Sequence, residues 1–345
     1  MLSAIKIQGF KCFDEVDLTL GNLTLLTGVN SAGKSSVIQA LLLLLQQENE
    51  AGNPLNGKYV RLGRIQDIKN WNTNPKQICI EAVFDDDADK CRLEMDMDEH
   101  VQLDGRKKLQ ECDLVYLSAD RIGAEDVYKQ NLANEYRIGI HGEYAFDYLS
   151  TERLNAIKEP AFACDEPGIN LGNQVDYWLH YIIGYNVTAE RIGGTEVVRV
   201  SYHSGENGSR EVKPRHVGTG VSYMANVITA ALSCRVGSIF VVENPEIHLH
   251  PAAQSKLLEF FCYLAKRGLQ IIVETHSDHI FNGIRKNIKK GNITSDQAKV
   301  YFFTQDEMRM TRTVAIEIDE NGVIQNQKKG LFDQFDDDLD ELLGL

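Results

Sequence analysis

The amino-acid sequence predicts an α/β fold with a mainly parallel core sheet, an antiparallel β section and an inserted helical subdomain. Near the N-terminus, short apolar runs lead into the glycine-rich segment GVNSAGKSS, which a helix-forming stretch follows. From residue 217 onward, apolar strands and helical segments alternate again. Strands that are joined by crossover helices form mainly parallel sheets. The residues between these N-terminal and C-terminal α/β parts lack the alternation of strands and helices. They therefore predict the antiparallel β section and the inserted helical subdomain.

Residues 1–123 are expected to form an N-terminal lobe that contains the antiparallel β section. Residues 2–28 alternate short apolar runs with turn signals, which predicts two or three strands. The stretch SVIQALLLLLQQ, which begins at Ser35, contains no glycine, proline or turn cluster and predicts a mostly buried helix. Residues 50–115 mix turn signals with the strand-like segments ICIEAVF, RLEMDM and LVYLSA, and this pattern predicts the antiparallel section.

The rest of the chain is expected to form three further parts. Residues 124–195 predict an inserted helical subdomain, with YAFDYLSTERLNAIK and QVDYWLHYIIGY as its best helical segments, before TEVVRVSYH returns to a strand pattern. Residues 196–330 predict a C-terminal lobe, in which Pro251 begins a helix that ends just before Gly268. Residues 331–345 predict an acidic amphipathic C-terminal helix.

Composition and charge narrow the function classes. The net charge of −14 argues against a broad nucleic-acid surface, because non-specific DNA affinity comes mainly from lysine and arginine on phosphates. The seven scattered cysteines contain no CxxC pair, which indicates reduced packing residues rather than zinc or redox chemistry. No apolar run approaches the roughly 20 residues of a membrane span, and the N-terminus lacks a secretory pattern. We therefore expect a cytoplasmic protein without a membrane partner.

The segment from Gly28 to Ser35 matches the pattern GxxxxGK[ST] between an expected strand and an expected helix. Its glycines let the backbone wrap tightly, so that successive N–H groups and the helix start point at phosphate oxygens. The Lys34 ammonium supplies a charge at the β- and γ-phosphates, and the Ser35 hydroxyl can ligate Mg²⁺. A glycine turn before an ordinary helix is the weaker alternative, because chance would produce the pattern in only about one chain in a hundred of this length. The segment predicts an ATP and Mg²⁺ site formed by Asn30, Ser31, Ala32, Gly33, Lys34, Ser35 and Ser36.

Two apolar strands end in polar residues that suit phosphate chemistry. The first, from Ile239, ends at Glu243, which can hold Mg²⁺. Glu246 follows and can position water, although an acid favoured by the dipole of a helix start is an open alternative. The second strand, from Ile271, places His276 at the carboxyl edge of a sheet, where ligands of open α/β sheets gather. His276 is therefore predicted to sense the γ-phosphate, and Lys34, Glu243, Glu246 and His276 are the predicted catalytic residues.

A second glycine-rich turn, VGTGVS, opens a helix upstream of the strand that ends at Glu243. Backbone N–H groups at Gly218 and Gly220, together with the hydroxyl of Ser222, can meet a γ-phosphate. The alternative is a glycine-rich turn in which Ser222 only caps the helix. These three residues are the second predicted nucleotide-binding group.

The order GVNSAGKSS, VGTGVS, VVENPEIHLHP and IIVETHSDH resembles the ABC-type ATPase heads, which are P-loop NTPases, of RecF, SMC and OLD proteins. It is most similar to the short bacterial OLD-like ATPases of phage-defence operons, which GFKCF, LGRIQD, YLSADRIG and LFDQFDDDLDELL also resemble. The resemblance covers most of the chain and is weakest in residues 124–190. It implies that Gly28 to Ser35 form Walker A and that Gly218, Gly220 and Ser222 form a signature motif completing the partner's site in trans. It also implies that His276 is the switch histidine.

The resemblance further implies a coupling role for Gln66 or Asp67, as in a Q-loop, and for Ser118 to Gly123. One departure concerns hydrolysis: many ABC heads carry Asp-Glu before proline, whereas this chain carries Glu243-Asn244-Pro245. Glu243 then takes the Mg²⁺ role, and Asn244 cannot accept a proton as a general base. Glu246 is the candidate substitute, and we expect slow turnover, below about 10 s⁻¹.

Two other interpretations of the motifs are weaker. A zinc site of His248, His250, His276 and His279 lacks supporting cysteine or carboxylate ligands, and the HLHP loop is better explained as a contact with the opposite subunit. Asp336 and Asp338 could be mistaken for the acidic end of a Toprim nuclease. The apolar residues of that tail decide for a docking helix, because they fall on one helical face: Leu331, Phe332, Phe335, Leu339, Leu342 and Leu343.

Three functions follow as hypotheses. The favoured one is an ATPase, a homodimer or higher oligomer through an ATP sandwich, that controls a separately encoded effector in bacterial anti-phage defence. The alternative is a RecF/SMC-like DNA repair ATPase that clamps DNA, which the acidic charge disfavours. The third is a nucleotide-gated scaffold with negligible hydrolysis, for which Asn244 is the reason.

Overall fold

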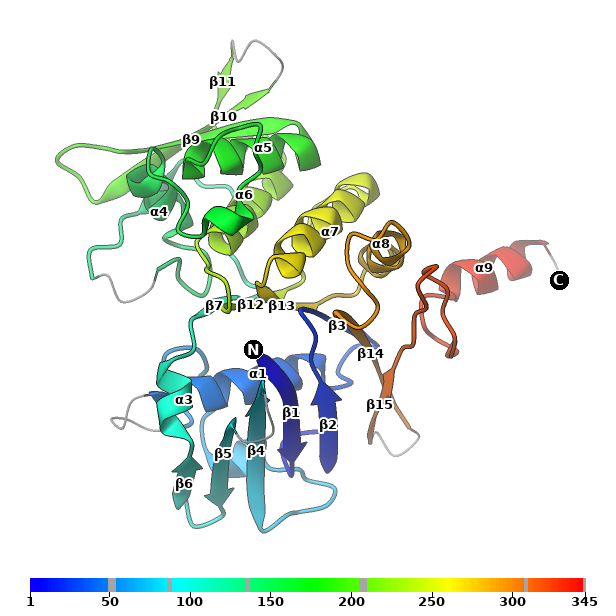
Figure 1. Ribbon diagram of the computed structural model, residues 1–345. Coiled ribbons are helices and arrows are strands. Elements are labelled where there is room, and N and C mark those ends of the chain that lie inside the picture. The colour runs from blue at the N-terminus through cyan, green and yellow to red at the C-terminus, as the bar shows by residue number, and fades with distance from the viewer. Residues whose placement is uncertain (49–53, 86–88, 134–136, 205–209, 307–309, 344–345) are drawn as a thin grey trace. The chain divides into compact units, whose positions relative to one another are not determined.

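The computed structural model describes residues 1–48, 54–85, 89–133, 137–204, 210–306 and 310–343 (Figure 1). The chain divides into two compact units. Unit 1 comprises Met1 and residues 111–275, and unit 2 comprises residues 2–110 and 276–345. The N-terminal and C-terminal segments of the chain therefore belong to one unit, and the middle segment forms the other.

An antiparallel sheet in unit 2 has the strand order β2-β1-β4-β5-β6. Along β2 and β5 buried side chains alternate with more exposed ones, which is the pattern of a sheet with one covered face. Helix α1, which is mostly buried, lies against this sheet (Figure 1). These elements confirm the predicted buried helix and, for β4 to β6, the predicted antiparallel section. Their bounds are β1 Leu2–Gln8, β2 Glu15–Thr19, α1 Lys34–Leu45, β4 Gln77–Phe84, β5 Asp89–Asp96 and β6 Val101–Asp104.

A second group of strands in unit 2 carries the glycine-rich loop. Strand β3 pairs in parallel with β14, and β15 pairs antiparallel with β14. Helix α8 follows Ser277, whose hydroxyl accepts hydrogen bonds from the N–H groups of His279 and Ile280 at 3.1 and 3.2 Å and so caps the helix. The bounds are β3 Leu23–Gly28, η1 Gln46–Glu48, α2 Ile65–Ile68, α3 Arg106–Gln110, α8 Asp278–Lys289, β14 Ala298–Gln305, β15 Thr311–Ala315 and α9 Gln334–Leu343.

Unit 1 contains three parallel strands, in which β12 lies between β7 and β13. Almost every residue of β12 and β13 is buried, as expected for parallel strands that are covered on both faces. The segment LVYLSA was predicted to belong to the antiparallel section, and this prediction is wrong, because β7 is a parallel partner of β12. A short apolar run is compatible with either sheet. The bounds are β7 Leu114–Leu117, α6 Thr219–Leu232, β12 Ile239–Glu243, α7 Pro251–Lys266 and β13 Gln270–Glu274.

A second sheet of unit 1 is built around β10, which pairs antiparallel with β8, β9 and β11. Trp178 of α5 packs on Phe260 of α7, with ring centroids 4.8 Å apart. Residues 124–195 were predicted as an inserted helical subdomain; they contain α4 and α5, but also β8 and β9, which were not predicted. The bounds are β8 Val127–Lys129, α4 Ala145–Glu152, η2 Pro160–Phe162, α5 Leu171–Ile183, β9 Tyr185–Arg191, β10 Val197–Ser204, β11 Glu211–Val212 and η3 Pro214–His216.

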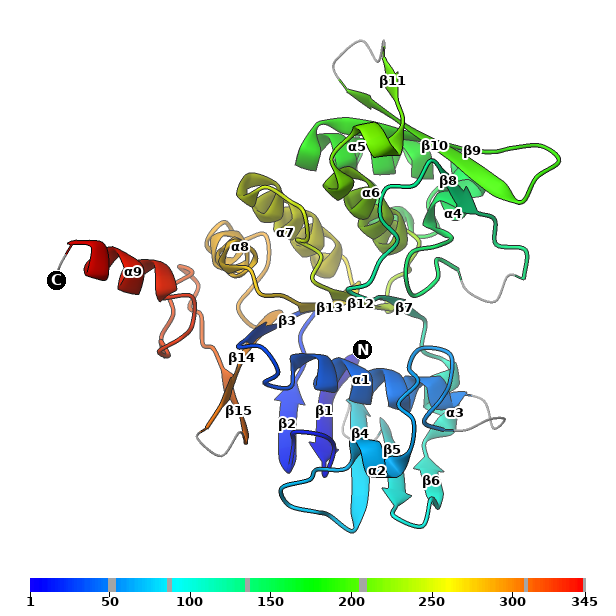
Figure 2. The same cartoon turned by 180° about the vertical axis from the view of Figure 1, so that it is seen from behind.

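The C-terminal helix α9 begins later than predicted, at Gln334. Leu331 and Phe332 therefore precede the helix. Leu331 is buried, and the half-buried Phe332 ring packs on Phe281 with ring centroids 5.3 Å apart. In both views α9 extends away from the strands of unit 2 (Figure 1 and Figure 2). The side chains of residues 334–337, including Phe335 and Asp336, lie outside the described part. The leucines of the predicted apolar face are exposed to 41%, 83% and 64% at Leu339, Leu342 and Leu343.

None of the described helices combines the length and the hydropathy that a membrane span requires.

Candidate nucleotide-binding site

The glycine-rich loop of unit 2 connects β3 to α1 and has a backbone that only glycine can form at two positions. Gly28 has φ 133°, and a Cβ atom there would lie 2.1 Å from the carbonyl oxygen of Phe303. Gly33 has φ 105°, and a Cβ atom there would lie 2.6 Å from Sγ of Cys12. No side chain caps the start of α1 at Gly33, and Ser35 is exposed in its first turn. This is the geometry in which a helix start binds phosphate.

The Lys34 side chain is buried and lies along this loop. Its ammonium donates hydrogen bonds to the carbonyl oxygens of Gly28 and Val29 at 3.0 and 2.8 Å. Two side chains from the neighbouring strands hold the loop: Gln305 donates to the Ser31 carbonyl at 2.8 Å, and Thr311 donates to the Ala32 carbonyl at 3.1 Å. These two residues were not predicted, because no local motif contains them.

His276 lies near Lys34 within unit 2. The pKa of the His276 imidazole is lowered by desolvation and, to a smaller extent, by the positive charge of Lys34. His276 precedes the cap of α8, so the helix start fixes its backbone. Two of the predicted catalytic residues, Lys34 and His276, are thus brought together although they are far apart in the sequence.

Glu243 ends β12 in unit 1, and its carboxylate is held by two donors. The Tyr116 hydroxyl donates to Oε1 at 3.1 Å, and the Ala119 N–H donates to Oε2 at 3.1 Å. Burial, followed by the charge of Glu243, raises the pKa of Tyr116 well above its usual value, so the phenol stays a donor. A carboxylate held this way by a parallel neighbour strand has a fixed position, as a Mg²⁺ ligand requires.

Arg121 fastens the end of β12 from inside unit 1. Its guanidinium donates to the carbonyl oxygens of Ser118 at 2.8 Å, Glu243 at 2.6 Å and Asn244 at 2.8 Å. The Tyr223 ring of α6 lies 5.4 Å from the guanidinium carbon. Burial lowers the pKa of Arg121. The stretch from Ser118 to Gly123 was predicted only as a coupling surface, and no pattern in the sequence revealed this internal role of Arg121.

Asn244 and Glu246 form the turn that follows β12. Asn244 has φ 43°, a left-handed conformation that asparagine tolerates better than most residues, and its N–H donates to the Glu274 carbonyl at 2.7 Å. The Glu246 carboxylate accepts a hydrogen bond from the Thr275 hydroxyl at 2.6 Å. Glu246 is therefore held against the end of β13, the parallel partner of β12.

The second glycine-rich turn opens α6 in unit 1. A Cβ atom on Gly220 would lie 2.5 Å from the His248 carbonyl oxygen, so glycine permits the close approach of these two backbones. Ser222 is fully buried and its hydroxyl accepts a hydrogen bond from the Tyr202 hydroxyl at 2.9 Å. Thr219 is exposed in the same turn. The outward hydroxyl is therefore that of Thr219 and not that of Ser222.

A cavity of about 460 Å³ adjoins this turn. It is lined by the starts of α6 and α7 and by the end of α5, including Gly218, Gly220, His248, His250 and Lys256. Two helix starts and a lysine around one cavity favour an anion. The contact of the HLHP loop, residues 248–251, with an opposite subunit stays a prediction.

Other predicted positions have local roles. Asp67 accepts a hydrogen bond from the Arg64 N–H at 3.0 Å and so caps α2, and Gln66 is exposed. In the described part of the chain, Asp96, Asp98 and His100 form the one group of three potential metal ligands that lie close together. Asp96 already accepts the N–H groups of Asp98 and His100 at 2.9 and 3.0 Å, which is the geometry of a polar turn between β5 and β6.

Comparisons with known proteins match most of the chain. A family model described as "AAA domain, putative AbiEii toxin, Type IV TA system" matches residues 89–282. A model described as "AAA ATPase domain" matches residues 1–162, and one described as "Protein of unknown function (DUF3696)" matches residues 293–342. The OLD nuclease of Thermus scotoductus is 24% identical over 331 residues, which cover 80% of this chain and 59% of the nuclease. The chain therefore spans somewhat more than half the length of this relative.

Solved structures of SMC heads share the fold. The SMC head bound to the C-winged helix domain of ScpA has a TM-score of 0.58 at 14% identity, and covers 92% of this chain and 97% of that one. The SMC head domain from Thermotoga maritima has a TM-score of 0.51 at 13% identity, and covers 92% and 99%. An SMC head with an extended coiled coil, bound to ScpA derived from Pyrococcus furiosus, has a TM-score of 0.54 at 10% identity, and covers 99% of both chains. Together with the ATPase family models, the shared fold confirms the predicted fold class, an ABC-type P-loop ATPase head. The OLD nuclease and the SMC heads confirm the predicted resemblance.

Proposed function

This chain belongs to the AAA-domain family whose model matches residues 89–282, and we propose that it binds Mg-ATP and uses binding and slow hydrolysis to control its assembly and a partner effector. The observation that carries the proposal is the loop of unit 2. There, a glycine-shaped backbone leads into an uncapped helix start, with the Lys34 ammonium among the loop carbonyls and within electrostatic reach of His276. Each of these features suits a polyphosphate.

We assign the nucleotide contacts as follows. The N–H groups from Asn30 to Ser36 surround the phosphates, and Lys34 exchanges the loop carbonyls for the β- and γ-phosphate oxygens. Ser35 and Glu243 are the proposed Mg²⁺ ligands, since both supply the hard oxygen donors that Mg²⁺ prefers. A Mg²⁺ ion held there would neutralise phosphate charge during hydrolysis. His276 contacts the γ-phosphate.

Slow hydrolysis is proposed because the turn after β12 lacks the usual base. Asn244 cannot accept the proton of the attacking water, and the Glu246 carboxylate, which Thr275 holds, is the proposed replacement. In the second subunit of an ATP sandwich, Gly218 and Gly220 would present the start of α6 to the γ-phosphate. Since Ser222 is buried against Tyr202, we propose that Thr219 supplies the outward hydroxyl there.

The effector is proposed from the relative. The named activity of the OLD protein is that of a nuclease, and this chain matches only 59% of that protein. We propose that this ATPase controls a separately encoded effector, such as a nuclease, in bacterial anti-phage defence within the cytoplasm. A clamp on DNA is the second candidate, because the SMC heads share the fold, but the net charge of −14 opposes it.

Light scattering with and without Mg-ATP tests the proposal. We expect the wild-type assembly to grow when Mg-ATP is added, the growth to be lost in Lys34→Ala, and the larger form to persist longer in Glu246→Gln, which should bind but not hydrolyse. Lys107→Ala, an exposed lysine in α3, is the matched control and should behave as wild type. An assembly that ignores Mg-ATP in all variants would refute nucleotide-controlled assembly. A DNA shift that requires ATP and weakens with salt would instead favour the clamp.

A further inference from the structure

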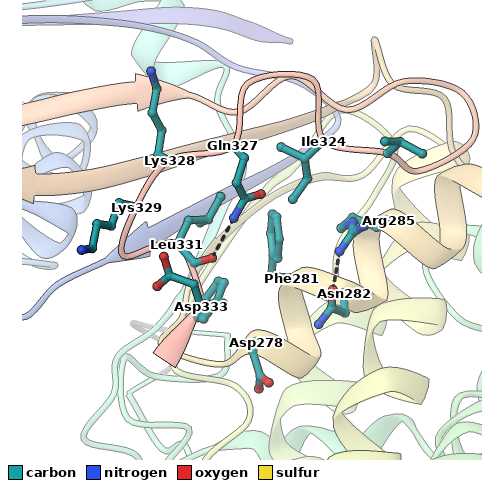
Figure 3. A pocket seen from close by; sticks show the side chains of 12 residues that line it. Asp278, Phe281, Asn282, Arg285, Ile324, Gln327, Lys328, Lys329, Leu331 and Asp333 are labelled. Atoms are coloured by element: carbon teal, nitrogen blue, oxygen red, sulfur yellow. Dashed lines mark hydrogen bonds between the residues drawn. The ribbon is translucent and has the colours of Figure 1, made fainter. Parts of the chain in front are cut away.

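A groove in unit 2, which we call the α8 groove, lies between α8 and the chain that leads to α9 (Figure 3). Its volume is about 830 Å³. In Figure 3 the side chains of Phe281, Ile324 and Leu331 lie together at its centre, with Arg285 on one side and Lys328 and Lys329 on the other. The groove therefore has an apolar centre between basic flanks.

The apolar lining of the α8 groove is buried at its base and exposed at its edge: Phe281 and Leu331 are each 2% exposed, and Ile324 is half-buried. Phe281 stacks on Phe332 with ring centroids 5.3 Å apart, and Val323 at the edge is 50% exposed. The Arg285 guanidinium is fixed at the rim, because it donates to the Gly322 carbonyl at 2.9 Å and lies 5.9 Å from the Phe281 ring. An apolar helix face can pack on the exposed part of this lining.

The charges of the α8 groove favour an acidic occupant. Lys328 and Lys329 are both exposed, in a chain whose net charge is −14. Two acids also line the groove: Asp333 accepts the Gly330 N–H at 2.8 Å, and Asp278 begins α8. With Arg285, the basic side chains outnumber the acidic ones, which is the reverse of the balance of the whole chain.

Helix α9 has the complementary surface. Leu339, Leu342 and Leu343 lie on one stripe at helical spacing, and all three are exposed. Asp338 and Asp340 lie about 100° to either side of Leu339, since each residue turns an α-helix by that angle. The helix sequence QFDDDLDELL contains no basic residue. A leucine stripe between acids matches an apolar groove between lysines and an arginine.

We propose that α9 of a second copy of this chain occupies the α8 groove, and that the two copies exchange their helices reciprocally. A chain cannot easily fill its own groove, because Asp333 lines the groove and α9 begins at the next residue, whereas a reversal between helices takes about 2–5 residues. Exchange between two copies is isologous, so it buries both leucine stripes at once. This contact is distinct from an ATP sandwich and needs no nucleotide.

The test uses two charge-reversed chains, both full length and free of nucleotide. The groove variant is Lys328→Glu/Lys329→Glu, and the helix variant is Asp338→Lys/Asp340→Lys. Lys76→Glu/Lys107→Glu, two exposed lysines elsewhere in unit 2, is the matched control. The dissociation constant of the dimer is measured by analytical ultracentrifugation for each variant, for an equimolar mixture of both, and for a chain that carries all four substitutions.

We expect the wild type and the control to dimerise and the groove and helix variants each to dimerise at least about tenfold more weakly, because like charges then face each other. The mixture should recover dimers of mixed composition, since each groove then meets a helix of opposite charge. The chain with all four substitutions should also dimerise. A mixture that stays monomeric, a monomeric wild type, or single variants as dimeric as the wild type would each overturn the proposal. Because no nucleotide is present, these outcomes are independent of whether the ATP site functions.

Discussion

Replacement of Arg121 by alanine tests how the end of β12 is held. The side chain is 3% exposed and donates three hydrogen bonds to backbone carbonyls, at 2.8, 2.6 and 2.8 Å. Alanine would leave the carbonyls of Ser118, Glu243 and Asn244 without these donors inside unit 1. The backbone that carries the proposed Mg²⁺ ligand would then lose its internal support.

The magnitude follows from these contacts. A hydrogen bond that involves a charged group contributes about 1.5–3 kcal/mol, so three give an upper limit of roughly 5–9 kcal/mol. Removal of Arg121 also relieves a desolvation cost, since burial lowers the pKa of its guanidinium. We therefore expect Arg121→Ala to lower the free energy of unfolding of unit 1 by about 2–4 kcal/mol.

Denaturant unfolding and ATP hydrolysis are the assays. Arg210→Ala, an exposed arginine of the same unit, should change the stability by less than about 0.5 kcal/mol. Arg121→Lys should fall between alanine and wild type, because lysine cannot present the planar fork that reaches several carbonyls. The reasoning is refuted if Arg121→Ala unfolds with the free energy of the wild type and hydrolyses ATP at the same rate.

Three further predictions concern single residues. Gly28→Ala should destabilise unit 2 by about 2–4 kcal/mol, because its Cβ would lie 2.1 Å from the Phe303 carbonyl oxygen. Gly237→Ala, at φ 83° with open space around it, should cost only about 1 kcal/mol. Equal losses of stability in thermal unfolding would contradict this. The lowered pKa of His276 means that the unfolded chain binds the proton more tightly, so the stability contribution is complete above pH 6.5 and is lost as the pH falls through the lowered pKa. Unfolding midpoints between about pH 5 and 8 should therefore have a smaller pH slope in His276→Asn, and unchanged slopes would count against the lowered pKa that burial and, to a smaller extent, Lys34 produce. Asn244→Asp should raise ATP turnover, because it supplies a carboxylate and tolerates the left-handed φ of 43°; slower turnover at unchanged stability would show that the missing base is not what limits hydrolysis.

The elements with strong local patterns could be predicted from the sequence. The loop from Gly28 to Ser35 is specified by its own residues, because the backbone there requires glycine at positions that the pattern fixes. Helices α1, α5 and α7 were recognised from helical spacing and end signals. Four strands of the antiparallel sheet, β1, β2, β4 and β5, were found because short apolar runs between turn signals are visible in the sequence, whereas β6 was not predicted.

The parts that were missed depend on contacts between distant segments. β9 follows the end of α5 at Gly184 without a loop, so its alternation was merged with the preceding helix. β7 could not be assigned to the parallel group, since a short apolar run does not reveal its partner. The contacts of Arg121 and Gln305 join segments more than 100 residues apart, with sequence separations of 122 and 274. No local pattern carries such information.

In the second glycine-rich turn, VGTGVS, the sequence also could not show which side chain faces outward. Sequence spacing pointed to the Ser222 hydroxyl, but the helix turns that side chain inward against Tyr202 and leaves Thr219 outside. What buries Ser222 is its partner Tyr202, which lies 20 residues earlier in the sequence on β10. Spacing from the turn alone therefore could not decide which hydroxyl faces outward.

Binding of Mg-ATP by the purified chain, measured by isothermal titration calorimetry for the wild type and for Lys34→Ala, tests the central claim most directly. We expect the wild type to bind at one site per chain and Lys34→Ala to bind at least about tenfold more weakly, with the same unfolding midpoint without nucleotide as the wild type within a few degrees. Equal affinity in the two chains, or no binding by a folded wild type, would contradict the assignment of the loop from Gly28 to Ser36 as the ATP site.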